Sequence, residues 1–552
     1  MAIKCYSILT TLIALTFQSL IAQSLVGEWS YIIPDDQKIV SICINDSGYL
    51  AFGQGRNFDE FSELLKIDTA GNLIWRRGLK FADTTISDSY SFDMVKVKNE
   101  LSYYTSGFYF ATISSDYILK IDDLGDTLWS YIYNPFGIYQ TTSKLTTLRD
   151  KSLLSVGFQE QGGTQEDVFV RRLDSMGKVM WEKMYPMPGN QRGFDITEML
   201  DGSLIVSARS GLNNLIMRID FNGKFLDSIM IPTISGNVVF QDVNLLFDNG
   251  IGLGVVSRVG TSTNFGQFID LDSGLNIRKN QAFDQGVYDG PYLLSDSSYI
   301  LNIFKSNDSL SVVNINSNSL SPLWSIPYGQ VPTAIKFVES LVSQGQDLIV
   351  AGYDDTGSNQ DYWLAKISGV GEEWIPDRCA YQPPIAGFDY EYNYPVLTLR
   401  DTSSGGLKYL DTVYTWQWNT SVGTNGTDDS LVVFFDTAIT KTIDIELVIG
   451  NWYGCTDTVN QTLVLGETGL ELYKELDVKV FPNPVKDILN VHIAEVQGDV
   501  LFSLYDLQGR LQFNQVLYKD KNTISISELP QGLYIYDLRT NAQVNRGKLI
   551  KK

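Results

Sequence analysis

The chain has 552 residues, of which 44% are hydrophobic and 12% aromatic. This length exceeds what one hydrophobic core supports and predicts three or four globular domains. The net charge of −22 at pH 7 argues against nucleic-acid binding, which needs a cationic surface, and against anionic membranes as partners. Val, Ile, Tyr, Phe and Thr are abundant and glycine turns recur, so we expect an all-β protein.

The N-terminus has the features of a Sec signal peptide. A short basic start precedes an apolar run over residues 8–21 and the small residue Ala22. We expect cleavage after Ala22, so that residues 1–22 form the signal peptide. The run is short for a membrane-spanning helix, and no later segment is apolar enough to cross a bilayer. A transmembrane segment is therefore not expected.

A repeated element dominates residues 25–376. Its clearest copies join an aliphatic residue, an Asp, a Gly three positions later and a Trp, and they occupy residues 66–75, 120–129 and 172–181. Weaker copies begin at Arg218, Asp270, Asn314 and Lys366. The period of roughly fifty residues lies in the range of β-propeller repeats.

Each copy has the features of a β-hairpin. The Asp carboxylate can accept a hydrogen bond from the backbone two residues on, and the Gly takes the positive φ of a type I turn followed by a bulge. The second strand carries the Trp into the packing between sheets. A further turn-and-strand element precedes each hairpin, so the fourth repeat is expected to contain strands at 194–200, 203–209, 215–220 and 224–231.

Four strands in each of seven repeats predict a seven-bladed β-propeller over residues 23–376. Trp29 lies ahead of the first repeat and resembles the Trp of a blade's last strand. We expect its segment to pair with the final repeat and close the ring, which removes open sheet edges. The hairpins resemble the repeats of quinoprotein dehydrogenase propellers and, more closely, those of uncharacterised secreted propellers. A quinone site is not part of this resemblance, and no cofactor is expected.

The connections between strands predict where a ligand binds. The first and third turns of each repeat are short, whereas the other connections differ between repeats and are expected to be long at 53–61, 107–117, 158–167, 259–268 and 352–362. Variable loops on a rigid scaffold often carry recognition. The ligand-binding candidates are Phe136, Tyr139, Arg192, Tyr288, Tyr292 and Tyr328. Such side chains stack on sugars or anchor a protein; alternatively, the aromatic ones pack between neighbouring blades.

Residues 377–467 are expected to form a second domain after a linker at 377–385. Alternating short strands around Trp416 and Trp418 predict an immunoglobulin-like β-sandwich. The order of these strands resembles that of a PKD domain, which implies a spacer or a weak binding unit. Residues 419–421 replace the Gly-Asp-Gly that usually follows the tryptophan strand.

Cysteine usage predicts one disulfide. Three cysteines follow the signal peptide, and an exported chain permits a pair and one leftover thiol. Cys379 and Cys455 bracket the same predicted domain and are the expected pair. Cys43 lies in an apolar strand and is expected to be a buried small hydrophobe.

The last residues carry an ordered set of motifs. Pro482, Asn483 and Pro484 form the first, Gly509 lies in Tyr-Asp-Leu-Gln-Gly-Arg, and Gly532 and Tyr534 follow in Pro-Gln-Gly-Leu-Tyr. This order resembles the type A C-terminal sorting domain of the type IX secretion system. Residues 475–552 are expected to form a second small sandwich; the alternative is an ordinary terminal immunoglobulin-like domain.

The resemblance implies export through the periplasm and across the outer membrane, removal of the tail, and often attachment to surface lipopolysaccharide. The implied partners are the type IX machinery and its tail-processing sortase, and the implied location is secreted or outer cell surface.

The composition offers little catalytic chemistry. The single histidine, His492, lies in the tail, so the body of the chain has no Ser-His-Asp or Cys-His site and no imidazole metal ligand. Most carboxylates recur at the same turn position, as Asp68 and Asp122 do, which indicates a structural role. Residues 354–361 form the best calcium-like loop, without a proper EF-hand pattern.

Three functions remain open. The first is a surface-displayed, non-enzymatic binding or adhesion protein whose propeller loops recognise a glycan or a protein. The second is a carbohydrate-active enzyme, a glycosidase or lyase that uses carboxylates or Tyr and Arg. The third is a structural component of the envelope. Fold alone does not choose among them.

Overall fold

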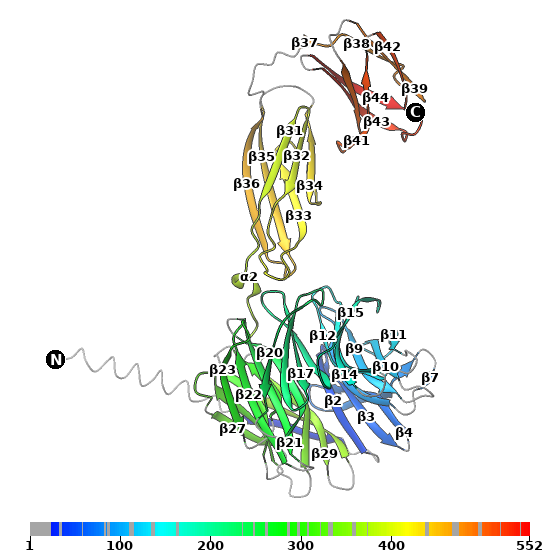
Figure 1. Ribbon diagram of the computed structural model, residues 1–552. Helices are drawn as coiled ribbons and strands as arrows, with labels where there is room; N and C mark the ends of the chain where they lie inside the picture. The colour runs from blue at the N-terminus through cyan, green and yellow to red at the C-terminus, as the bar shows by residue number, and fades with distance from the viewer. Residues whose placement is uncertain are drawn as a thin grey trace, which may run out of the picture. The chain divides into compact units, whose positions relative to one another are not determined.

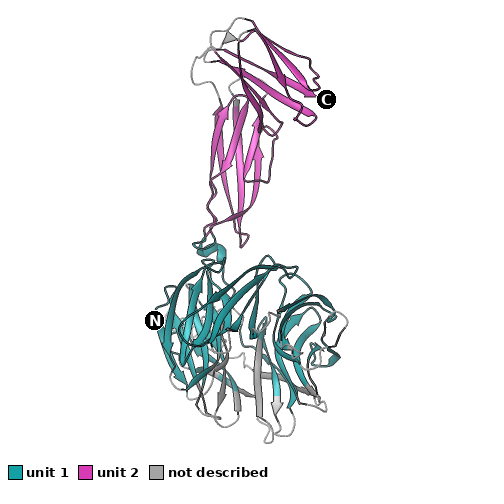
Figure 2. Ribbon diagram, turned by 45° about the vertical axis from the view of Figure 1, so that its right-hand side comes forward, with its two compact units in different colours: residues 1–382, 407–410 teal, residues 383–406, 411–552 magenta. Residues whose placement is uncertain are grey.

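The fold is that of a computed structural model. It describes residues 24–31, 36–57, 59–81, 84–85, 89–109, 115–133, 139–161, 165–233, 236–246, 249–259, 263–283, 287–294, 298–305, 309–320, 322–328, 335–355, 360–371, 374–435, 441–465, 474–494, 499–518, 520–540 and 543–552. The expected signal peptide lies outside these residues. The chain divides into two compact units (Figure 2): residues 1–382 with 407–410, and residues 383–406 with 411–552.

The described part of unit 1 contains seven four-stranded antiparallel sheets (Figure 1). Sheet 1 is β2 (Asp36–Asn45), β3 (Gly48–Asn57), β4 (Asp59–Asp68) and β5 (Leu73–Gly78). Sheet 2 is β8 (Ser89–Lys96), β9 (Ser102–Tyr109), β10 (Ser115–Asp122) and β11 (Thr127–Tyr133). Sheet 3 is β12 (Tyr139–Thr147), β13 (Leu153–Gln161), β14 (Gln165–Leu173) and β15 (Val179–Tyr185). Sheet 4 is β16 (Gln191–Glu198), β17 (Leu204–Ser210), β18 (Asn213–Ile219) and β19 (Phe225–Pro232).

The remaining sheets complete the series. Sheet 5 is β20 (Asn237–Leu246), β21 (Gly250–Val259), β22 (Thr263–Leu271) and β23 (Ile277–Phe283). Sheet 6 is β24 (Val287–Leu293), β25 (Ser298–Lys305), β26 (Ser309–Asn316) and β27 (Pro322–Tyr328). Sheet 7 is β28 (Ile335–Gln344), β29 (Asp347–Asp355), β30 (Gln360–Ser368) and β1 (Ser24–Tyr31). A small hairpin, β6 (Lys80–Phe81) with β7 (Thr84–Thr85), follows sheet 1.

The sheets form a closed ring. The first strand of each sheet contacts the first strand of the next, from β2 through β8, β12, β16, β20 and β24 to β28, and β28 contacts β2 again. Within sheet 7, β1 pairs antiparallel with β30, and Trp29 lies opposite Leu364. This is the closure expected from Trp29, and it covers the edge that β30 would otherwise expose.

The Asp-to-Gly turn has the expected geometry. The Asp68 carboxylate accepts hydrogen bonds from the backbone N–H groups of Ala70 (2.9 Å) and Asn72 (2.7 Å), and Gly71 has φ +84°. Corresponding turns begin at Asp122, Asp174, Asp220 and Asp272. The Asp272 turn differs because Leu275, rather than a glycine, takes the positive φ.

The tryptophan of one repeat packs on the turn glycine of the next. A Cβ atom added to Gly177 would lie 2.8 Å from the Trp129 ring, and one added to Gly223 would lie 2.9 Å from the Trp181 ring. The Trp129 indole also donates a hydrogen bond to the Ser175 carbonyl (3.1 Å). Glycine is thus required both for its backbone angle and for the space that the neighbouring ring fills.

The hydrophobic core is divided among the interfaces between neighbouring sheets. One cluster joins Leu50 and Leu64 of sheet 1 to Tyr103 and Ile121 of sheet 2. Cys43 lies in this cluster as a buried, free thiol, and burial raises its pKa to about 12. The thiol therefore stays protonated and inert near neutral pH, as expected of a small core residue.

Polar contacts also join the sheets. Asp116 of sheet 2 accepts hydrogen bonds from the backbone N–H (3.0 Å) and the hydroxyl (2.7 Å) of Thr142 in sheet 3. Arg171 of sheet 3, whose side chain is fully buried, lies 3.7 Å from the Asp116 carboxylate and donates to Gln140 (2.9 Å) and Glu182 (2.5 Å). The buried charges are thus paired, as burial requires.

Asp116 predicts a pH dependence of stability. Burial raises the pKa of its carboxyl to about 6 from 3.8, against the attraction of Arg171. Because the folded-state pKa lies above the unfolded one, the contribution of Asp116 to the free energy of unfolding is complete below about pH 4 and declines as pH rises through about 6. We expect Asp116→Asn to flatten part of this decline, measured as the urea midpoint against pH. If the urea midpoint of Asp116→Asn declined with pH as steeply as that of the wild type, the decline would belong to other titratable groups.

Several strand boundaries differ from the expected ones. The strands of sheet 4 lie close to prediction, but the long connections predicted at 53–61 and 259–268 are mostly strand: β3 continues to Asn57 and β22 begins at Thr263. Backbone pairing continues beyond the point where the hydrophobic alternation ends. The predicted linker at 377–385 contains a short helix, α2 (Arg378–Tyr381), which Asp377 caps by accepting from the backbone N–H groups of Cys379 and Ala380.

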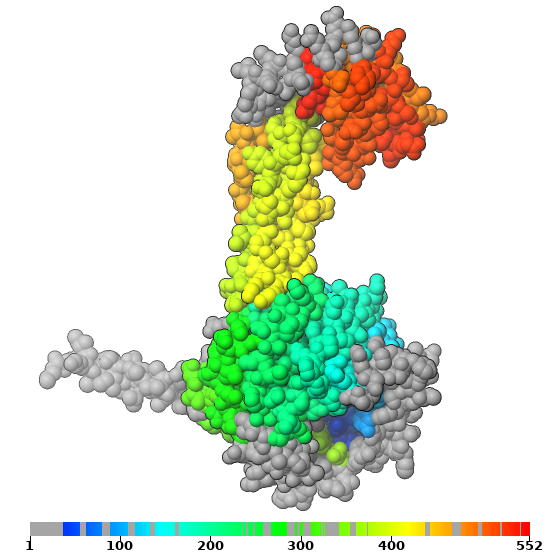
Figure 3. Space-filling model, viewed as in Figure 1, coloured from blue at the N-terminus to red at the C-terminus, as the bar shows by residue number. Residues whose placement is uncertain are grey.

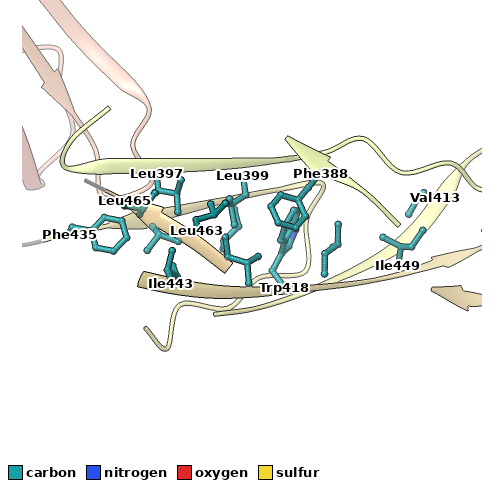
Figure 4. Close-up of a cluster of buried hydrophobic side chains, with 14 residues drawn as sticks. Phe388, Leu397, Leu399, Val413, Trp418, Phe435, Ile443, Ile449, Leu463 and Leu465 are labelled. Atoms are coloured by element: carbon teal, nitrogen blue, oxygen red, sulfur yellow. The ribbon is translucent and has the colours of Figure 1, made fainter. Parts of the chain in front are cut away.

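Unit 2 begins with two packed three-stranded sheets. One is β31 (Phe388–Asn393), β32 (Val396–Asp401) and β34 (Ser430–Phe434); the other is β33 (Val413–Thr420), β35 (Lys441–Asn451) and β36 (Thr456–Leu465). Their apolar faces meet around Trp418 (Figure 4). Trp418 is fully buried, donates from its indole to the Asp428 carbonyl (2.9 Å) and meets the Phe388 ring edge-on at 5.4 Å.

The C-terminal part of unit 2 has two further sheets. The larger is β37 (Lys474–Glu475), β44 (Gln543–Lys551), β43 (Gly532–Arg539), β40 (Val500–Tyr505) and β41 (Leu511–Leu517). The smaller is β38 (Val478–Phe481), β39 (Ile488–Ile493) and β42 (Asp520–Ser525). These sheets share a separate core that includes Leu489, Phe502 and Leu538.

Candidate functional site

The predicted ligand-binding residues divide into two groups. Tyr139 begins β12, and Arg192 is the second residue of β16, in neighbouring sheets 3 and 4. Tyr288 and Tyr292 belong to β24 and Tyr328 ends β27, both in sheet 6, where the structure describes only their backbone. Phe136 lies outside the described residues. The structure therefore brings together Tyr139 and Arg192, the two candidates whose side chains it describes.

Tyr139 and Arg192 both contact Phe158. The Tyr139 ring lies 6.1 Å from the Phe158 ring at 45°, and the Arg192 guanidinium lies 4.3 Å from the same ring. The Phe108 ring of sheet 2 lies 5.1 Å from the Tyr139 ring. Phe108 and Phe158 are buried, whereas the Tyr139 side chain is 42% exposed. We call Phe108, Tyr139, Phe158, Arg192 and Glu166 the Tyr139 patch.

Close backbone contact positions the two halves of the Tyr139 patch. Strand β16 contacts β13, and a Cβ atom added to Gly193 would lie 2.7 Å from the Gly157 carbonyl oxygen. Arg192 and Phe158 directly adjoin these two glycines, so the lack of side chains there lets the guanidinium reach the ring. Sheets 3 to 5, cyan-green to green in Figure 3, form a continuous surface on the side of the ring that faces the viewer.

The charges of the patch are paired. Arg192 donates from Nε to Glu166 Oε2 (2.6 Å) and from Nη2 to Glu166 Oε1, which together raise the pKa of the guanidinium. Arg209 lies opposite Arg192 in β17 and 3.9 Å from the Glu166 carboxylate. Burial, and then Arg192, lower the pKa of Arg209. Such a forked pair holds the guanidinium plane in one orientation.

The sequence did not single out Phe158, Glu166 or Phe108. Phe158 and Phe108 lie near the ends of the second strands of their sheets, and Glu166 lies near the start of a third strand. One feature of the sequence could have indicated Phe158 and Phe108: both are aromatic residues at the point where a second strand enters a variable connection. That end of the sheet also carries the predicted candidates.

A concave region lies among the first strands of the ring. It has a volume of about 460 Å³ and is lined by residues of β2, β8, β12, β16, β20 and β28. Its charged residues include Asp93, Lys144, Asp195 and Asp242. Pockets of this size hold small ligands in many proteins.

The carboxylates in this region tie the sheets together. Asp93 accepts from the Ser41 hydroxyl (3.1 Å) and the Leu145 backbone N–H (2.9 Å), and so joins sheets 1, 2 and 3. Asp195 accepts from the Val243 backbone N–H (2.9 Å) and joins sheets 4 and 5. Burial raises the pKa of both carboxyls. Asp93 also lies 3.9 Å from the Lys144 ammonium, and Asp195 interacts with the Asp242 carboxyl. All these partners belong to the ring itself, which indicates a structural role.

The motif residues of the tail hold its strands together. The Asn483 side chain donates to the Lys548 carbonyl (2.7 Å) and accepts from the Ile550 backbone N–H (2.9 Å), so it fixes β44. The bonds preceding Pro482 and Pro484 are cis. Gly509 has φ +77° in a turn whose first residue, Asp506, accepts from two backbone N–H groups, as in the repeats. The Tyr534 hydroxyl donates to the Pro530 carbonyl (2.8 Å), and Gly532 begins β43.

Cys379 and Cys455 are each disulfide-bonded. Their pairing with one another stays a prediction. Among the described residues, no group of three or more His, Cys, Asp and Glu side chains is arranged to hold a metal ion. Half of the calcium-like loop lies outside that part of the chain, because residues 356–359 are not described. The described residues also contain no helix of the length and apolarity needed to span a membrane.

Comparison with known families identifies the tail. Residues 479–552 match the model of the secretion system C-terminal sorting domain. These residues are a C-terminal sorting domain. The protein is therefore a substrate of the type IX secretion system, directed to the cell surface or the outside. The resemblance seen in the motif order of the tail is confirmed.

The comparisons with curated proteins and solved structures add less. Curated proteins give no match. Among solved structures, the Dos1 propeller is 12% identical, covers 69% of this chain and 93% of its own, and has a TM-score of 0.39. A protein of unknown function from Dyadobacter fermentans DSM 18053 is 10% identical, covers 63% of this chain and 100% of its own, and has a TM-score of 0.41. A prolyl endopeptidase is 9% identical, with a TM-score of 0.39, and only 55% of its length is covered. TM-scores this low carry no argument about function.

Proposed function

We propose that the protein is a non-enzymatic binding or adhesion protein, exported by the type IX system, that recognises a glycan or a protein at the cell surface. In this proposal the seven sheets are the blades of a β-propeller, followed by a PKD-like and a terminal immunoglobulin-like sandwich. The propeller is the recognition platform, and the sandwiches serve as spacer and sorting signal. The Tyr139 patch is the observation that carries the proposal.

Two features support binding rather than turnover. The Tyr139 patch exposes an aromatic ring whose orientation is fixed by buried neighbours, which lowers the entropic cost of binding. The Asp93 and Asp195 carboxyls in the concave region are engaged by groups of the ring itself: backbone N–H groups, the Ser41 hydroxyl, Lys144 and Asp242. A glycosidase instead needs two carboxyl groups free to flank the scissile bond.

A binding screen tests this function. The secreted protein is labelled and applied to a glycan array and to fractionated surface proteins, and the same ligands are then analysed for cleavage products. We expect binding without products. Release of shortened sugars would favour the carbohydrate-active enzyme, and a protein that binds nothing would favour the structural envelope component.

A further inference from the structure

The hydrogen-bonding groups of the Tyr139 patch are incompletely used. The Tyr139 hydroxyl makes no hydrogen bond to a described residue, and its only ring contacts there are Phe108 and Phe158. Arg192 uses Nε and Nη2 for Glu166, which leaves the two N–H groups of Nη1 without a protein acceptor in the described chain. A fixed aromatic face is thus bordered by free donors and by the Glu166 carboxylate.

The charge of the patch limits the class of ligand. Arg192 and Arg209 are balanced by Glu166 and by Glu160, which lies opposite Tyr139 in β13 and also raises the pKa of Arg192. The whole chain carries a net charge of −22. An acidic polymer would therefore be repelled at long range and would find no excess positive charge at the patch.

The exposed apolar area of the patch also limits the class of ligand. Phe108 is 2% and Phe158 8% exposed, so among the described residues of the patch Tyr139 alone presents a large apolar surface. A stable protein interface buries roughly 800 Å² on each partner around an apolar centre, far more than one ring. One ring is enough for a sugar, whose C–H face covers an aromatic side chain while its hydroxyls bond to polar groups at the rim.

We propose that the Tyr139 patch binds an uncharged pyranose unit of a glycan. The C–H face of the sugar lies on the Tyr139 ring. Its hydroxyls accept from Arg192 Nη1 and donate to Glu166, and the Tyr139 hydroxyl bonds a neighbouring unit. This assignment rests on the proposed binding function and names its ligand and its site.

The test compares four forms of the full secreted protein: wild type, Tyr139→Ala, Tyr139→Phe and Phe225→Ala. Phe225 is a matched control, because its ring is 43% exposed and it begins β19, at the opposite end of sheet 4 from Arg192. Calorimetric titration with neutral glucans, mannans and xylans, and with polygalacturonate as the acidic probe, gives the affinities. Thermal unfolding of each variant shows that the fold is retained.

We expect a neutral glycan to bind wild type and Phe225→Ala equally, and Tyr139→Ala about three- to tenfold more weakly. Tyr139→Phe, which keeps the ring, should lose less affinity than Tyr139→Ala. Affinity should change little between about 0.1 M and 1 M salt, because no ion pair forms with the ligand. The assignment would be overturned if polygalacturonate bound more tightly than the neutral glycans, or if no neutral glycan bound at all.

The outcomes separate the ligand from the function. If a neutral glycan binds and Tyr139→Ala binds it as tightly as wild type, the binding function stands and the site is wrong. If only a protein partner is captured, the function again stands and the sugar assignment fails. If the glycan is cleaved during titration, the non-enzymatic function itself fails.

Discussion

Removal of residues 475–552 is expected to leave the protein in the periplasm, with none at the cell surface or in the medium. The residues from 479 onward match the sorting domain, and they fold around a core of their own that includes Leu489, Phe502 and Leu538. Deletion thus removes the signal and leaves the other cores in place. Immunoblots of periplasm, surface and medium measure the distribution.

A point variant refines this result. Asn483→Ala removes two hydrogen bonds that hold β44, so we expect reduced secretion of an otherwise intact chain. Tyr518→Ser is the matched control, because this side chain is 65% exposed and its loss should leave secretion unchanged. Normal export of the 475–552 deletion would show that the tail is not the sorting signal.

Trp418→Ala is expected to unfold the first sandwich of unit 2 at moderate temperature. The Trp418 side chain is fully buried, and its loss leaves a cavity and removes the indole hydrogen bond to the Asp428 carbonyl. Replacing a buried Trp by Ala costs about 3–5 kcal/mol. For a domain of this size the melting temperature should fall by at least about 12 °C, measured by calorimetry of the full chain.

Neighbours in the same strand control for this prediction. Tyr414 lies in β33 with Trp418 but is 42% exposed, so Tyr414→Ala should shift the transition much less. Trp418→Phe keeps a ring against Phe388 and loses the indole hydrogen bond. Its shift in melting temperature should lie between those of Tyr414→Ala and Trp418→Ala. Equal shifts for Tyr414→Ala and Trp418→Ala would contradict the central role of Trp418.

Local chemistry made the repeats predictable. Asp68 and Gly71 specify a turn within five residues, and the sheet order follows from repeating that turn. Trp29 predicted the pairing of β1 with β30 because it matched a position already recognised in other strands. In these cases the interacting groups are near in sequence or belong to a repeated pattern.

The contacts between sheets were not predictable in the same way. Asp116 meets Thr142, and Arg171 reaches back to Asp116, across sheets whose facing positions follow no repeated pattern. The Tyr139 patch has the same origin: Tyr139 and Arg192 were each expected on variable connections, but Phe158 joins them only because Gly157 and Gly193 let two strands approach. Such close contacts between strands of different sheets cannot be predicted from a single sequence.

The pairing of β1 with β30 restricts how the ring can be shortened. One of the four strands of sheet 7 comes from Ser24–Tyr31, ahead of every repeat. A fragment that starts at the first repeat would lack this strand and expose the backbone donors and acceptors of β30 to other chains. Recombinant fragments and N-terminal fusions must therefore keep Ser24–Tyr31, although this segment lies outside the repetitive part of the sequence.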